Sequence, residues 1–102
     1  MGKNLAFSAL LDVYGRFLSK KQKNLAEHYY NEDLSLSEIA ENEGITRQGV
    51  SDNIRRAENK MLLWEEECGF CESFQKLKEL ALEAQTGSET AIKEMLRIID
   101  DL

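Results

Sequence analysis

The stretch GITRQGVSDNIRRA, residues 44–57, decides the fold. Gly44 precedes Thr46, and threonine is a favoured N-terminal cap of a helix. A glycine just past a helix supplies the left-handed conformation, which other residues adopt at a cost of about 1 kcal/mol or more. The stretch therefore predicts a tight turn at Gly44, followed by a helix whose inner face carries Val50, Ile54 and Ala57 at helical spacing.

A short helix precedes this turn. Ser35 and Glu38 have the spacing of a capping box, in which the hydroxyl and the carboxylate each accept from an otherwise unpaired backbone N–H. Leu36, Ile39 and Ala40 face inward, and the small Ala40 lets the next helix cross closely. Two helices joined in this way form a helix-turn-helix, whose second helix can lie in the major groove of DNA.

Apolar periodicity predicts helices along the rest of the chain, so the fold class is all-α. The first helix covers residues 5–18, and the second begins at Ser19, where Ser19 and Gln22 fit another capping box. The helix after Thr46 continues to the acidic run 65–67. The inward side of the first helix carries Leu10, Leu11, Tyr14, Phe17 and Leu18.

Two further amphipathic helices follow, over residues 70–84 and from a cap at Ser88 onward. Their apolar stripes indicate core packing or, alternatively, an oligomer interface. We expect a helix-turn-helix domain at 1–67 and an acidic C-terminal helical extension at 68–102, packed on that domain or on a partner subunit. The last helix carries its stripe on Ile92, Met95, Leu96 and Ile99.

The net charge of −6 is unevenly distributed. Nine Lys and Arg balance nine Asp and Glu in residues 1–60, whereas residues 61–102 have four against ten. The acidity therefore belongs to the C-terminal part and does not oppose an anionic partner at the helix-turn-helix. Because the apolar stretches are only a few residues long, we expect a cytoplasmic protein without a membrane partner.

Burial of one side of the helix after Thr46 leaves polar residues on its other side. The first turn places guanidinium and amide groups where they can address base edges, and later arginines can reach phosphates. Two lysines at the start of the second helix add backbone contacts. The candidate nucleic-acid-binding residues are Arg47, Gln48, Ser51, Asp52, Arg55, Arg56, Lys60, Lys20 and Lys21; ordinary solvated charges are the alternative interpretation.

Asp52 and Gly49 are unusual on this face. Phosphate repels the Asp52 carboxylate unless it accepts from a cytosine amino group or pairs with Arg55 or Arg56. Gly49 costs helix stability, on the order of 1 kcal/mol relative to alanine, but permits close backbone approach.

Other reactive side chains do not form a recognisable catalytic or metal site. Cys68 and Cys71 are a lone CxxC and indicate two semi-buried thiols at helical spacing, while the only histidine, His28, is expected to be partly exposed. The acidic run 65–67 indicates a solvated face. We therefore expect no enzyme activity, no cofactor and no metal.

Three blocks in order, LLDVYGRFLSKKQ, YYNEDLSLSEIAE and ITRQGVSDNIRRAE, resemble the YlxM family of small bacterial proteins over about residues 10–60. The helix-turn-helix of that family is similar to region 4 of sigma factors. The resemblance implies an all-α fold of the winged-helix-like superfamily, nucleic-acid binding, and a regulatory or accessory part in the signal recognition particle pathway.

These observations favour a DNA-binding protein that regulates transcription, with duplex DNA as its partner. They leave the oligomeric state open, and a homodimer is one possibility. The alternative is a protein or RNA adapter of the protein-targeting or transcription machinery, in which the helix-turn-helix is only a scaffold and the signal recognition particle protein or RNA is the partner.

Overall fold

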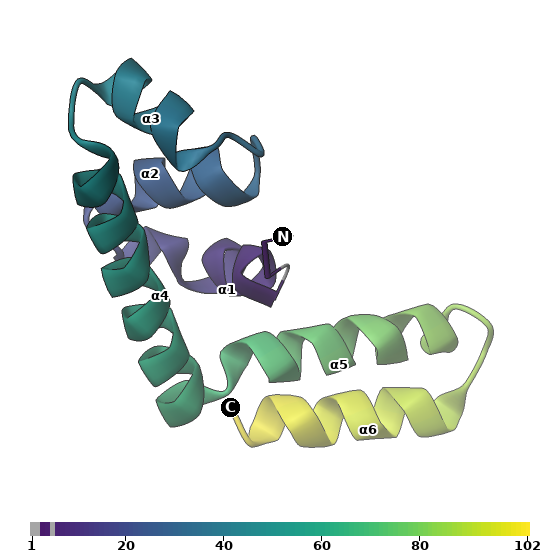
Figure 1. Cartoon of the computed structure of the whole chain (residues 1–102). Coiled ribbons are helices and arrows are strands. Elements are labelled where there is room, and N and C mark those ends of the chain that lie inside the picture. The colour runs from purple at the N-terminus through teal and green to yellow at the C-terminus, as the bar shows by residue number, and fades with distance from the viewer. Residues whose placement is uncertain (1–2, 5) are drawn as a thin grey trace. The chain divides into compact units, whose positions relative to one another are not determined.

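The computed structural model describes residues 3–4 and 6–102, and the prediction of an all-α fold is confirmed. The chain divides into two compact units, residues 1–67 and residues 68–102. A single turn of 3-10 helix, Gly15–Phe17, follows the first α-helix. The α-helices are α1 (Ala6–Tyr14), α2 (Lys20–Tyr30), α3 (Leu36–Glu43), α4 (Arg47–Cys68), α5 (Phe70–Ala84) and α6 (Glu89–Asp100) (Figure 1).

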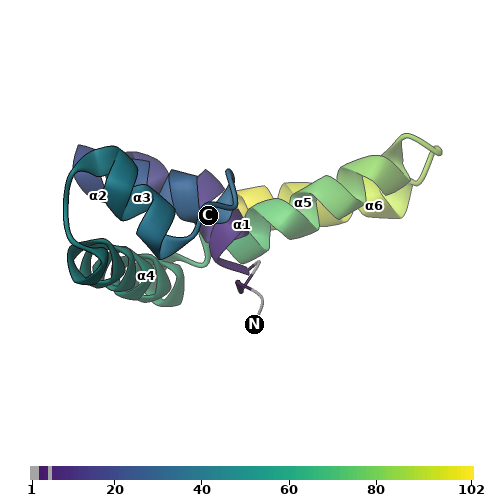
Figure 2. The same ribbon diagram turned by 45° about the horizontal axis from the view of Figure 1, so that its top comes forward.

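The interior of the first unit includes a cluster from α2, α3 and α4, which lie together in both ribbon views (Figures 1 and 2). Burying one such aliphatic side chain contributes roughly 1.5–3 kcal/mol. Further buried residues of α1 and α4, among them Leu11, Tyr14 and Met61, extend this interior. The cluster consists of Leu25, Ile39, Ala40, Val50 and Ile54, with Tyr29, Tyr30, Leu34, Leu36 and Ile45 packed against it.

The turn between α3 and α4 has the predicted glycine geometry. Gly44 is left-handed, with φ 67° and ψ 30°, and its N–H donates to the carbonyl of Ala40. The N–H of Ile45 donates to the same carbonyl at 3.2 Å. At the other end of α3, Ser35 and Glu38 form the predicted capping box. Both ends of this eight-residue helix are therefore closed by local hydrogen bonds.

The capping box predicted at Ser19 is only half formed. The Ser19 hydroxyl accepts from the N–H of Gln22 at 3.1 Å, as expected. The Gln22 side chain does not return to Ser19, because it is buried and its Oε1 accepts from Lys60 of α4 at 3.0 Å. The Gln22 amide therefore bonds to α4 and does not cap α2 as the local sequence pattern predicts.

The first helix is also shorter than predicted. Leu5 lies outside the described residues, and α1 ends at Tyr14, where the chain tightens into the 3-10 turn. Because that turn has about three residues per revolution, it rotates Phe17 away from the interior, and Phe17 is 63% exposed. The prediction that Phe17 faces inward is therefore wrong, while Leu18 beside it is buried.

Lys3 ties the start of the chain to the connection between α2 and α3. Its Nζ donates to the carbonyl oxygens of Tyr29 at 2.6 Å and Leu34 at 2.7 Å. The ammonium lies 3.3 Å from the Asp33 carboxylate and 4.0 Å from the centre of the Tyr29 ring. Asp33 has a left-handed φ of 55°, so one cation supports a turn that contains a strained residue.

The second unit is an antiparallel pair of helices, α5 and α6, joined by a turn through Gly87 (Figure 1). Ser88 caps α6 as predicted, since its hydroxyl accepts from the N–H of Ala91. Ile92, Leu96 and Ile99 of the predicted α6 stripe are about half exposed, so α5 does not bury them fully. Core packing and an oligomer interface both stay predictions for this stripe.

Replacing Gly44 tests the turn. A Cβ at this position would meet no atom within 4 Å, so the left-handed φ alone opposes a side chain. We expect Gly44→Ala to lower the free energy of unfolding by about 1 kcal/mol or more. Gly44→Asn should cost less, because asparagine tolerates this conformation. Urea unfolding followed by circular dichroism measures both, and equal losses for the two variants would contradict the argument.

Candidate nucleic-acid interface

Helix α4 presents one side to the interior and the other to solvent. Thr46 begins it as predicted, since its Oγ1 accepts from the N–H of Gly49 at 2.9 Å. Four apolar side chains on α4 are buried at steps of three and four, which fixes the rotation of the helix about its axis. The buried residues are Val50, Ile54, Ala57 and Met61.

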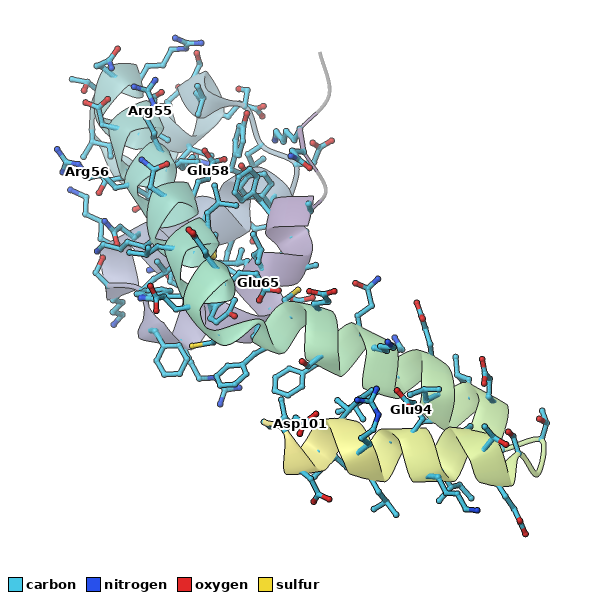
Figure 3. The ribbon with its side chains drawn as sticks, turned by 90° about the horizontal axis from the view of Figure 1, so that it is seen from below. Arg55, Arg56, Glu58, Glu65, Glu94 and Asp101 are labelled. Carbon is cyan, nitrogen blue, oxygen red and sulfur yellow. The ribbon has the colours of Figure 1, made fainter. Side chains whose placement is uncertain are left out.

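The predicted residues of α4 lie on or beside the opposite side. Arg47, Gln48, Arg55 and Arg56 are exposed, whereas Ser51 and Asp52 are half-buried. Figure 3 shows Arg56 on one side of the α4 ribbon and Glu58 on the other. We define the α4 outer face as Arg47, Gln48, Ser51, Asp52, Arg55 and Arg56.

Asp52 is paired, but not with an arginine. Its Oδ1 accepts from Nε2 of Gln48 at 2.9 Å, one turn earlier. The pair leaves the second carboxylate oxygen and the Gln48 carbonyl as acceptors on the α4 outer face. In the major groove such acceptors match the amino groups of cytosine and adenine.

Lys60 differs from the other candidates. Its ammonium donates to Oε1 of the buried Gln22 and so joins α4 to α2. This bond satisfies an amide that would otherwise be an uncompensated polar group in the interior. Lys60 therefore has a structural task, and a contact with phosphate would require it to leave Gln22.

Lys20 and Lys21 lie at the start of α2, beside the helix-turn-helix turn. Both are exposed, and they line a hollow of about 490 Å³ together with Glu43 and Ile45, which flank Gly44. The fold thereby brings these lysines to the turn that precedes α4. Leu25 and Asn24 complete the lining.

The structure adds two asparagines, which the sequence analysis did not single out, to the candidate nucleic-acid-binding residues. Asn59 is exposed and follows Arg55 by four residues, so helical spacing places it beside the α4 outer face. Asn24 lines the hollow at the turn, four residues after Lys20. The i, i+4 spacing of both was the available signal. Asn53, by contrast, turns back and donates to the carbonyl of Gly49 at 2.8 Å.

Two carboxylates of α4 are bound by tyrosines of other helices. The hydroxyl of Tyr30 donates to Glu58, and burial raises the pKa of that glutamate. The hydroxyl of the buried Tyr14 donates to Oε1 of Glu65 at 2.6 Å. The prediction that the acidic run 65–67 is a solvated face is therefore wrong for Glu65.

His28 joins α2 to the end of α3. Its Nδ1 contacts the carboxylate of Glu32, and its Nε2 lies 3.2 Å from Oε1 of Glu43. The hydrogen bond with Glu32, followed by the negative charges of both glutamates, raises the pKa of His28. The side chain is partly exposed, as predicted.

The CxxC residues do not share one helix. Cys68 ends α4 and is exposed, whereas Cys71 lies in α5 and is half-buried. Gly69 between them has a left-handed φ of 64°, which breaks the helix. The expectation of two semi-buried thiols at helical spacing is therefore wrong for Cys68.

A protein-family model described as "Putative helix-turn-helix protein, YlxM / p13 like" matches residues 1–101. The chain belongs to this family. Among relatives named UPF0122 protein, that of Shouchella clausii is 35% identical over 102 residues, covering 98% of this chain and 94% of the relative. The relative from Listeria innocua is 35% identical over 97 residues, covering 93% and 88%. The relative from Clostridium kluyveri is 39% identical over 79 residues, covering 78% and 71%.

The resemblance to the YlxM family is thereby confirmed, and the helix-turn-helix of this YlxM/p13-like chain is α3, the turn at Gly44 and α4. Within residues 3–4 and 6–102, every helix is too short or too polar to span a lipid bilayer.

Truncating Lys60 tests its structural task in this YlxM/p13-like chain. We expect Lys60→Ala to lower the free energy of unfolding by about 1–3 kcal/mol, because Oε1 of Gln22 loses its donor. Lys21→Ala removes the same charge from an exposed position and should change stability by less than about 0.5 kcal/mol. Urea unfolding measures the free energy of unfolding of both variants. Equal losses would contradict a structural role for Lys60.

Titration of His28 tests the link between α2 and α3. Because the folded-state pKa is raised, the stabilisation is complete below the ordinary pKa of about 6.5 and is lost as the pH rises through the folded-state value. For so exposed a group we expect a loss of a few tenths of a kcal/mol to about 1 kcal/mol. Urea midpoints across this range should fall for the wild type relative to His28→Gln. Parallel curves would contradict the prediction.

Proposed function

We propose that this chain is a regulatory protein that binds duplex DNA by placing α4 in the major groove. The observation that carries the proposal is the α4 outer face, where Gln48, Arg55 and Arg56 are exposed away from the buried side of the helix and Arg47 is exposed in the first turn. Residues at the start of such a helix reach base edges, and cations further along reach phosphates.

The charge distribution supports this proposal. Arg47, Arg55 and Arg56 outnumber Asp52 on the α4 outer face, and Lys20 and Lys21 lie by the preceding turn. The Gln48 bond to Asp52 holds that carboxylate in place, so it can meet a base amino group while the arginines neutralise phosphates. The role of Asp52 is then to select a base.

The same proposal includes the role of the protein in the cell. Regulation of transcription, or an accessory part in the signal recognition particle pathway, rests on the resemblance to YlxM proteins. In this proposal residues 1–67 form the DNA-binding domain, and residues 68–102 form a domain for association with a partner. We place the protein in the cytoplasm and assign it no enzyme activity.

Salt dependence tests the proposal. Each phosphate contact contributes about −0.9 to the slope of log affinity against log salt concentration. We expect Arg55→Ala with Arg56→Ala to make the slope less steep by about two units. Fluorescence anisotropy with a random-sequence duplex measures this slope. Binding that is weak at low salt and indifferent to the double substitution would overturn the proposal.

Two controls accompany the measurement. Lys76→Ala with Lys78→Ala removes the same charge from α5 and should leave the slope unchanged if contacts, not net charge, determine it. Asp52→Asn removes the carboxylate charge from the α4 outer face, so affinity for random duplexes should rise. A fall in affinity for random duplexes would contradict the role assigned to Asp52, because a carboxylate that selects one base opposes binding to DNA of other sequences.

A further inference from the structure

The hydrogen bond between Gln48 and Asp52 fixes the orientation of an amide on the α4 outer face. Nε2 of Gln48 lies 2.9 Å from Oδ1 of Asp52, one helical turn further along. A carboxylate can only accept hydrogen bonds, so the NH₂ group of the amide must face Asp52. The opposite orientation would set the amide carbonyl against the carboxylate, two acceptors without a proton between them. Asp52 therefore determines which end of the Gln48 amide faces outward.

The oriented amide keeps one donor and one acceptor for a partner. Its NH₂ group carries two hydrogens, and the bond to Asp52 uses one of them. The second hydrogen and the carbonyl oxygen remain on an exposed residue. In the major groove, adenine offers the complementary pair, an N7 acceptor beside an N6 amino donor. Guanine offers two acceptors, cytosine one donor and thymine one acceptor, so adenine alone matches both groups of the amide.

Asp52 keeps an acceptor for a base of its own. Gln48 bonds Oδ1, and the second carboxylate oxygen stays available on the α4 outer face. This oxygen matches the amino group of cytosine, which has no acceptor beside it on the same base. Adenine suits the carboxylate less, because its N7 lone pair lies next to the amino group and repels the negative charge. The two bonded residues therefore prefer different bases.

The spacing of the two side chains sets the spacing of their bases. Four residues of an α-helix rise about 6 Å, and stacked base pairs lie about 3.4 Å apart. Along the major groove, Gln48 and Asp52 thus reach positions about two base pairs apart. Both belong to the first two turns of α4, and the N-terminal residues of a recognition helix are the ones that reach base edges.

We propose that Gln48 reads adenine and that Asp52 reads cytosine about two base pairs away, while Asp52 also positions the Gln48 amide. This inference rests on the proposed binding of duplex DNA. It names the class of target: duplexes that carry these two bases at that separation. Arg55 and Arg56 add affinity for any sequence, because phosphate contacts carry no base information.

Selection of sites from a randomised duplex library by the full chain tests the two base assignments. The wild type should enrich duplexes with adenine and cytosine about two base pairs apart. Gln48→Ala should lower discrimination at the adenine position by about 5- to 150-fold and leave the cytosine preference in place. Gln75→Ala removes the same exposed amide from α5 and should enrich the wild-type sites. Wild-type sites without either base, or equal results for the two variants, would overturn the proposal.

Two substitutions of Asp52 test its positioning role. Asp52→Ala should abolish the cytosine preference and also weaken the adenine preference, because the Gln48 amide is then free to turn over. Asp52→Asn keeps a carbonyl that can accept from Gln48, so it should restore the adenine preference without restoring that for cytosine. An adenine preference that is unchanged in Asp52→Ala would overturn the positioning role.

Random-duplex binding, measured in parallel on the same samples, separates this inference from the proposed function. Salt-dependent binding without any base preference would overturn the base assignments and leave DNA binding in place. Binding that stays weak even at low salt would overturn both. Circular dichroism of each variant identifies any loss of selection that comes from unfolding, and the wild-type sites alone still decide the base assignments in that case.

Discussion

The rotation of α4 about its own axis is the constraint on which the first unit depends. Val50, Ile54, Ala57 and Met61 are all buried, and they recur along one side of the helix. Turning α4 by a quarter revolution would expose several of them at roughly 1.5–3 kcal/mol each for the larger ones. That cost holds the arginine-bearing side outward without any contact made by the arginines themselves.

Polar contacts complement this apolar restraint along the flanks of α4. Lys60 bonds Gln22 of α2, Glu58 receives the hydroxyl of Tyr30, and Glu65 receives that of Tyr14. Hydrogen bonds require defined geometry, so they fix the position of α4 along its axis more narrowly than apolar contacts can. The α4 outer face is thus a rigid surface, which suits recognition of a regular partner such as duplex DNA.

Local chemistry explains what the sequence could predict. The Ser35 box, the left-handed Gly44 and the Thr46 cap involve residues a few positions apart, and each formed as expected. The hydrogen bond of Lys60 to Gln22 spans 38 residues, and that of Tyr14 to Glu65 spans 51. Because the partners are so far apart in the sequence, no local sequence pattern predicts these bonds. Periodicity identified the apolar side of α6, but it carries no information about what covers that side. The contacts of the α4 outer face with DNA stay a prediction.

Lys3 gives the start of the chain a part in the helix-turn-helix. Its ammonium is bonded to carbonyls 26 and 31 residues away, at the junction that leads into α3. A chain that began after Lys3 would leave both oxygens to water and remove the cation that faces Asp33. Amide hydrogen exchange around residues 31–35 would then quicken, so the stiffness of the helix-turn-helix is set in part by a side chain that precedes its first helix by more than thirty positions.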